Sequence, residues 1–83
     1  MRFHYSFQVS KLLRDLKELG APLRRAIEAL RHNPIPEDAR AIPERPGRYE
    51  IHVRVSQRGY WVIYEIDESG SETVITVSVI EPN

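Results

Sequence analysis

The sequence predicts an α+β fold with an N-terminal strand, an antiparallel helical hairpin and then a three-stranded antiparallel meander. Both helices are expected to cover one face of the sheet. Leucines recur at helical spacing in residues 10–30, residues 48–55 alternate between apolar and polar, and residues 59–66 join β-branched and aromatic types. A chain of 83 residues predicts a single domain, residues 1–83, with a modest core.

The N-terminal segment alternates over residues 3–9, which predicts a half-buried strand. Its apolar face would hold Phe3, Tyr5, Phe7 and Val9. His4 falls on the polar face, where an exposed histidine at the rim of the sheet is the simplest interpretation. Ser10 follows directly and is expected to cap the first helix.

Two apolar stripes predict the helical hairpin. The first consists of Leu12, Leu13, Leu16 and Leu19, and the second of Leu23, Ala26, Ile27 and Leu30. Gly20 is expected to end the first helix in a left-handed conformation, and Pro22 suits the first turn of the second. The spacing of four residues predicts weak ion pairs from Arg14 to Glu18 and from Arg24 to Glu28.

Prolines interrupt residues 33–47, which predicts a surface connection rather than a helix or a central strand. Residues 48–55 then form a strand with Tyr49, Ile51, Val53 and Val55 toward the core. Its other face would present Arg48, Glu50, His52 and Arg54. The four residues 56–59 are expected to turn the chain.

The run at residues 59–66 is apolar or aromatic on both faces, which predicts a central strand. Tyr60, Val62, Tyr64 and Ile66 would pack under the helices, and Trp61 and Ile63 would lie on the open face. A loop at residues 67–70 and a last strand at residues 73–80 complete the meander.

Composition narrows the classes of function. The absence of cysteine excludes a disulfide framework and a thiolate metal site. The three histidines lie at no metal-ligand spacing and no Gly-rich phosphate loop is present, so neither a metal nor a cofactor is predicted. The sequence starts like neither a signal nor a transit peptide and has no apolar run of membrane-spanning length, which predicts a cytoplasmic protein.

The formal charge of zero hides an asymmetry along the chain. Residues 1–58 contain 12 Lys and Arg against 7 Asp and Glu, a charge of +5, and residues 59–83 contain 5 acids and no base. A basic portion of this kind can bind an anion locally while the whole molecule stays neutral. Each segment solvating its own surface is the alternative interpretation.

The whole pattern resembles the RelE/ParE toxin superfamily of bacterial toxin–antitoxin systems. The likeness lies in the helical hairpin of residues 12–30, in Asn33-Pro34 followed by a Pro-rich connection to Gly47-Arg48-Tyr49, and in the strand Tyr60-Trp61-Val62-Ile63-Tyr64-Glu65-Ile66-Asp67. The strand is the most specific of the three, because it is similar to the family's Tyr-Arg-Val-Ile-Tyr-Glu-Ile-Asp.

The resemblance implies a cognate antitoxin protein as partner and one of two activities. RelE-like members cut messenger RNA on the ribosome without a metal, and ParE-like members poison DNA gyrase. The resemblance leaves open whether oligomers form through the antitoxin. It therefore implies a toxin that acts as an mRNA interferase, with a gyrase-inhibiting toxin or a non-toxic antitoxin-binding relative as alternatives.

Carried over by position, the resemblance assigns Arg54 and His52 as catalytic candidates. Arg45 and Arg48 match the family's basic approach to the sheet, whereas Arg58 lies in the turn and has no clear family counterpart. The candidates for binding RNA and its phosphates are Arg45, Arg48, Arg58 and Trp61. Arg54 either contacts phosphate or pairs with Glu65 or Glu50 as an ordinary sheet residue. Trp61 either stacks on a base or fills a groove or an interface.

The sequence departs from the family pattern at two places. Trp61 stands where the family usually has an arginine, and the last strand ends in Ser78-Val79-Ile80-Glu81-Pro82-Asn83 rather than in a basic or aromatic segment. Two cationic contributions to an active site are therefore missing. Removing one preorganised donor costs an enzyme about 2.7–4 kcal/mol of transition-state stabilisation.

Overall fold

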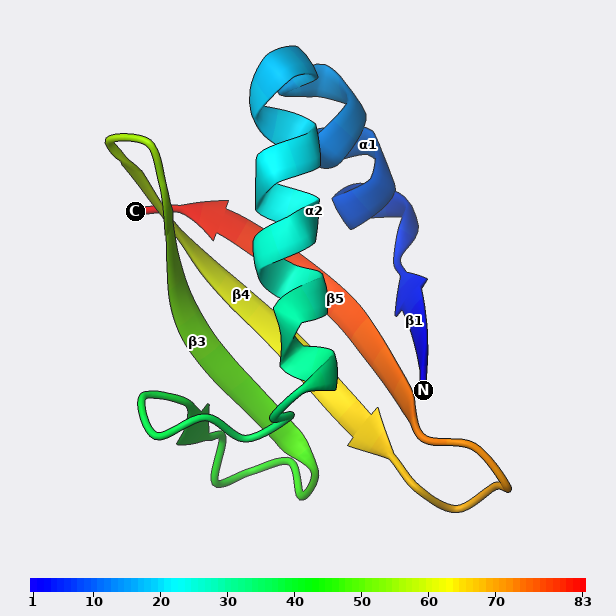
Figure 1. The fold of residues 1–83 in the computed structure, drawn as a ribbon. Coiled ribbons are helices and arrows are strands. Elements are labelled where there is room, and N and C mark those ends of the chain that lie inside the picture. The colour runs from blue at the N-terminus through cyan, green and yellow to red at the C-terminus, as the bar shows by residue number, and fades with distance from the viewer.

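Two helices cover one face of a five-stranded mixed sheet in the computed structural model, which describes residues 1–83 (Figure 1). The helical segments are α1 (Phe7–Asp15), η1 (Lys17–Leu19), α2 (Gly20–Glu28) and η2 (Ala29–Arg31). The strands are β1 (Arg2–Tyr5), β2 (Arg40–Ala41), β3 (Arg48–Val55), β4 (Arg58–Asp67) and β5 (Val74–Pro82). Their order in the sheet is β1-β5-β4-β3-β2, which confirms the α+β class, the meander and the central place of β4.

The first strand is shorter than predicted, because the chain turns into helix α1 at Phe7. Ser6, not Ser10, is the N-cap: its backbone is extended and its hydroxyl accepts a hydrogen bond from the Val9 N–H at 3.2 Å. Val9 is fully buried from the first turn of the helix, and Phe7 is 79% exposed rather than in the core. The prediction of a strand over residues 3–9 was therefore wrong beyond Tyr5.

The predicted role of Gly20 as the end of the first helix was also wrong. Lys17 takes the left-handed conformation after α1, with φ of +54°, whereas Gly20 begins α2 with a helical φ of −63°. A Cβ on Gly20 would lie 2.1 Å from the Leu13 carbonyl oxygen. Glycine is needed here because the backbones of the two helices cross too closely for a side chain.

Neither predicted ion pair within a helix forms. Glu28 instead accepts a hydrogen bond from the Tyr5 hydroxyl and lies 3.8 Å from Arg31. Arg24 stacks over the Tyr5 ring, 4.9 Å from its centroid. Burial and the hydrogen bond to Glu28 raise the pKa of Tyr5. These contacts fasten α2 to the first strand.

The β3–β4 hairpin turns through two residues, Ser56 and Gln57, rather than through the predicted four. Ser56 has φ of +58°, and the first central position of a two-residue hairpin turn requires a positive φ. The turn sets the register of the hairpin. Val55 pairs with Arg58, and the pairing continues residue by residue to Arg48, which pairs with Glu65. The shorter turn therefore shifts the side chains that face one another along the whole hairpin.

The core lies between the sheet and the helices, as predicted. Tyr60, Val62 and Tyr64 of β4 are each at most 2% exposed. The Tyr64 hydroxyl donates to the Pro34 carbonyl at 2.6 Å, and burial raises the pKa of Tyr64 to about 12. The Ile66 N–H donates to the Gly47 carbonyl at 3.0 Å. The Pro-rich connection is thus fastened to β4 before it enters β3.

The outer strands close the sheet on both sides of the meander. β1 pairs in parallel with β5, so segments from the two ends of the chain lie side by side (Figure 1). The two residues of β2 pair with β3 inside the predicted loop, with Arg40 opposite Glu50. No helix is both long and apolar enough to cross a membrane.

Candidate nucleic-acid interface

The face of the sheet opposite the helices is where most of the predicted site residues lie. Alternation along β3 puts Arg48, Glu50, His52 and Arg54 on this open face. Trp61, Ile63 and Glu65 of β4 lie beside them. Arg58 is opposite the buried Val55, so it belongs to the helix side at the end of the sheet. Arg45 is exposed in the connection before β3.

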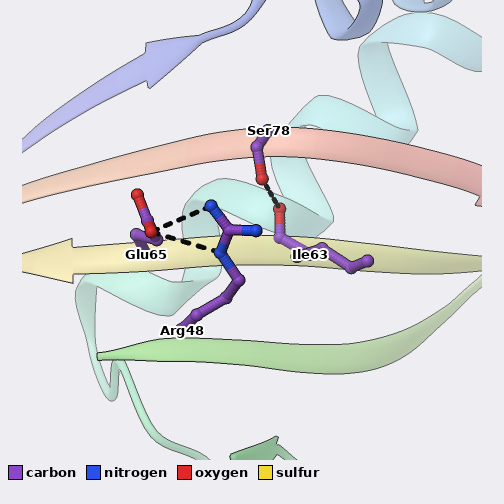
Figure 2. A network of polar contacts seen from close by, with 4 residues as sticks. All are labelled: Arg48, Ile63, Glu65 and Ser78. Atoms are coloured by element: carbon purple, nitrogen blue, oxygen red, sulfur yellow. Dashed lines mark hydrogen bonds and ion pairs between the residues drawn. The ribbon is translucent and has the colours of Figure 1, made fainter. Parts of the chain in front are cut away.

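Arg48 is neutralised by its neighbour across the strands (Figure 2). Its Nε and Nη2 atoms donate to one oxygen of Glu65 at 3.1 and 3.0 Å. The Arg48 side chain is 25% exposed and that of Glu65 40%. A guanidinium held in this way is already matched with an anion, which leaves it a poor partner for phosphate.

Next to this ion pair, β4 and β5 are joined by a side-chain contact. The Ser78 hydroxyl donates to the Ile63 carbonyl at 3.2 Å, where the register between the two strands shifts (Figure 2). Ser78 is the extra residue of the bulge, because Ile63 pairs with Val79 and Tyr64 with Val77. The bulge therefore lies in the middle of the open face, between the Arg48 end and the Trp61 end.

His52 and Trp61 form an aromatic pair directly opposite each other. Their ring centroids are 4.9 Å apart and the rings meet edge to face at 62°. The Trp61 indole N–H donates to Asn83 Oδ1 at 3.2 Å, and His52 Nε2 is buried without a hydrogen-bond partner. A Cβ on Gly59 would lie 2.6 Å from that nitrogen, so the imidazole rests over the glycine.

Arg54 and Arg58 both lie at the end of the hairpin, on opposite faces of the sheet, and neither has a carboxylate within 4.0 Å. Arg54 lies opposite Gly59, not beside Glu65, and Glu50 pairs with Arg40 at 3.2 Å instead. The ion pair with Glu65 or Glu50, which was one of the two interpretations of Arg54, is therefore absent. Both arginines line a cavity of about 390 Å³. Arg45 is not part of this cluster, since it precedes the other end of β3.

The sequence analysis missed three residues of this face. Glu65 accepts hydrogen bonds from Arg48, Gly59 lies directly beneath the imidazole of His52, and Asn83 accepts a hydrogen bond from Trp61. The hairpin register would have revealed the first. Ser56 and Gln57 as the only turn residues put Arg48 opposite Glu65 and Arg54 opposite Gly59. No pattern in the sequence signals the Asn83 contact.

No family model matches the chain, and neither a curated protein nor a solved structure is significantly similar to it. No group of three or more His, Asp or Glu side chains is placed to hold a metal ion.

Proposed function

We propose that this chain is the toxin of a bacterial toxin–antitoxin module of the RelE/ParE type, and that it inhibits growth by cleaving messenger RNA on the ribosome. One observation supports the choice of target most: Arg54, beside His52 on the open sheet face, has no carboxylate partner. The order of strand, helical hairpin and meander supports the class. The module would act in the cytoplasm with a cognate antitoxin as partner.

In this proposal Arg54 contacts the scissile phosphate and stabilises the charge that develops on it. His52 lies beside Arg54 on the same face of β3 and moves a proton. Arg58 and Arg45 contribute contacts to flanking phosphates, and such contacts account for most of the affinity for nucleic acid. Arg48 contributes little, because Glu65 already neutralises it.

A cleavage assay on ribosomes loaded with messenger RNA tests the proposal. The wild type is expected to cut, and Arg54→Ala is expected to lower the rate by about 10²–10³-fold, as for loss of one preorganised donor. Arg25→Ala is the matched control, because Arg25 is an exposed arginine of α2 without an ion pair. It is expected to cut at the wild-type rate. Absence of cleavage by the wild type would overturn the proposal.

Inhibition of DNA gyrase without chemistry is the second candidate function. The ion pair of Arg48 with Glu65 and the packing of Trp61 on His52 favour it, because both reduce the cationic character of the open face. An inhibitor that only binds needs no catalytic arginine. Gyrase supercoiling should then fall as the protein is added, and unchanged supercoiling at excess protein would exclude this target.

Induced expression in a bacterial host separates both toxins from a non-toxic relative that only binds an antitoxin. Arrest of growth is expected for either toxin. Normal growth with soluble, folded protein would oppose both and favour the antitoxin-binding relative.

A further inference from the structure

A groove of about 450 Å³ lies between helices α1 and α2, which cover the sheet on the side away from the open face (Figure 1). Its volume lies in the range of about 300–1,000 Å³ that is usual for ligand sites. Both helices contribute to its walls, which consist of Ser10, Leu13, Arg14, Gly20, Ala21, Arg24 and Arg25. The groove is strongly cationic, because three of these residues are arginines and none is acidic.

Arg14 has no internal counter-ion. All three arginines are exposed, and none has a carboxylate within 4.0 Å. Glu18 follows Arg14 by four residues, the spacing that favours an ion pair along a helix, but α1 ends at Asp15 and Glu18 belongs to η1. Asp15 pairs with Lys11 at 3.0 Å instead. The end of the helix thus leaves the Arg14 guanidinium free to bind an added anion.

Arg24 is held in place without losing its hydrogen-bond donors. Its guanidinium stacks over the Tyr5 ring, 4.9 Å from the centroid. Glu28, four residues later, accepts a hydrogen bond from the Tyr5 hydroxyl and lies 3.8 Å from Arg31, so it does not pair with Arg24. Stacking uses the flat face of a guanidinium, whereas the N–H groups point outward in its plane. A guanidinium fixed in this way can bind an anion with little further loss of side-chain freedom.

The lining also limits the kind of anion that fits. Guanidinium groups bind carboxylate or phosphate oxygens through paired N–H groups. One phosphate group carries about −1.5 to −2 charges near neutral pH, so a single phosphate leaves three arginines partly unmatched, whereas two linked phosphates match them. Only Leu13 and Ala21 offer apolar side chains, and no aromatic ring lines the groove for a nucleotide base to stack on. Two linked phosphates therefore fit better than a single carboxylate or a base.

We infer that this groove binds a diphosphate group, either as free inorganic pyrophosphate or as the diphosphate of a nucleotide. Arg14, Arg24 and Arg25 donate hydrogen bonds to its oxygens, and the Ser10 hydroxyl donates one more. The groove lies across the sheet from the candidate nucleic-acid interface. The inference therefore goes beyond the proposed function and does not depend on it.

Nuclear magnetic resonance titration of the full chain tests the inference, in a buffer free of phosphate and of divalent cations. Sodium pyrophosphate is expected to shift the amide signals of Ser10, Arg14, Ala21 and Arg25 in a saturable way. Orthophosphate should bind roughly tenfold more weakly, because one phosphate reaches fewer of the three guanidinium groups. ADP should bind within about threefold of pyrophosphate, and AMP as weakly as orthophosphate, since the base has no ring to stack on.

Two matched variants locate the binding. Arg14→Gln is expected to weaken pyrophosphate roughly tenfold, because it removes charged hydrogen-bond donors from the groove. Arg40→Gln makes the same change in net charge on the edge strand β2, outside the groove, and should leave the affinity unchanged. Both side chains are exposed, so both variants should fold like the wild type, which their melting temperatures check.

Four results would overturn the inference. They are no saturable shifts with pyrophosphate, equal affinity for pyrophosphate and orthophosphate, equal losses in Arg14→Gln and Arg40→Gln, or ADP binding more than about tenfold tighter than pyrophosphate, which would assign the groove to the base. None of them depends on cleavage. Arg25→Ala should bind pyrophosphate roughly tenfold more weakly and still cleave at the wild-type rate, so either property can fail while the other stands.

Discussion

Arg48 and Arg54 lie on the same face of the same strand and differ in what faces them on β4. Arg48 is opposite Glu65, which binds its guanidinium through two hydrogen bonds. Arg54 is opposite Gly59, which has no side chain, and it forms no ion pair. Two arginines on one face of one alternating strand therefore differ in whether they can bind an added anion.

Whether an arginine of β3 forms an ion pair therefore depends on the β4 residue opposite it, and not on its own position in an alternating strand. That neighbour is set by the turn, because Ser56 and Gln57 alone connect the two strands. The same register puts His52 opposite Trp61 and over Gly59. Gly59 thus both supports the imidazole and leaves Arg54 unpaired.

Gly59→Ala should disturb the Arg54 end most. The added Cβ would lie 2.6 Å from His52 Nε2 and 2.8 Å from its Cε1, and the ring is packed against Trp61. Overpacking of this kind costs about 1–3 kcal/mol, which urea denaturation would measure. His52→Ala should relieve most of that cost in a double-mutant cycle.

Gly70→Ala is the control for this substitution, because nothing lies within 4 Å of a Cβ there. Its effect should stay within about 0.5 kcal/mol. Equal effects of Gly59→Ala and Gly70→Ala would show that His52 does not rest over Gly59.

Arg54→Gln and Arg48→Gln test the comparison directly, given the proposed binding of RNA. Each phosphate contact contributes about −0.7 to the slope of log affinity against log salt for a single strand. Arg54→Gln should reduce that slope by about one contact, and Arg48→Gln should leave it unchanged. Fluorescence anisotropy of a labelled oligouridylate at several salt concentrations would measure it. Equal losses from the two variants would contradict the neutralisation of Arg48.

Glu65→Gln should release the Arg48 guanidinium, so that Arg48 as well as Arg54 would have no ion pair. Releasing the guanidinium should steepen the same slope by up to about 0.7. Glu44→Gln makes the same change in net charge without breaking an ion pair, since Glu44 has none. A matching increase in both variants would mean that net charge alone, and not the release of Arg48, strengthens binding.

The meander was predictable because its signals are strong and local. The bounds of β3 match the predicted residues 48–55, and β4 extends one residue beyond each end of the predicted residues 59–66. Tyr60, Val62 and Tyr64 are buried on the predicted face. Strict alternation in β3 and a long run of strand formers in β4 leave little room for another structure.

The start of the chain was harder to predict, because two patterns overlap there. Phe3, Tyr5, Phe7 and Val9 alternate like a strand. Val9 and Leu13 are also four residues apart, and both are buried in α1. The capping hydroxyl of Ser6 decides between the two patterns, and Ser10 offered an equally good cap in the sequence. Gly20 was misjudged because a close crossing of helices leaves no mark in the sequence.

The candidate residues for the site were predictable from the open face, but their pairing was not. A turn of four residues would have placed Arg54 beside Trp61, whereas the two-residue turn places His52 there. The positive φ of Ser56 is unusual for a residue other than glycine, asparagine or aspartate. Nothing in the local sequence signalled so tight a turn.

The parallel pairing of β1 with β5 also predicts an order of events during folding. Arg2–Tyr5 precede every other element in the chain, yet they pair with residues about 70 positions later: Val74, Ile75, Thr76 and Val77. Contacts between such distant segments form late, because closing a long loop costs entropy before any contact compensates for it. The helical hairpin and the β3–β4 hairpin are local and can form early. β1 is therefore expected to join the sheet last, and Phe3 and Tyr5 would become packed only after β5 has formed.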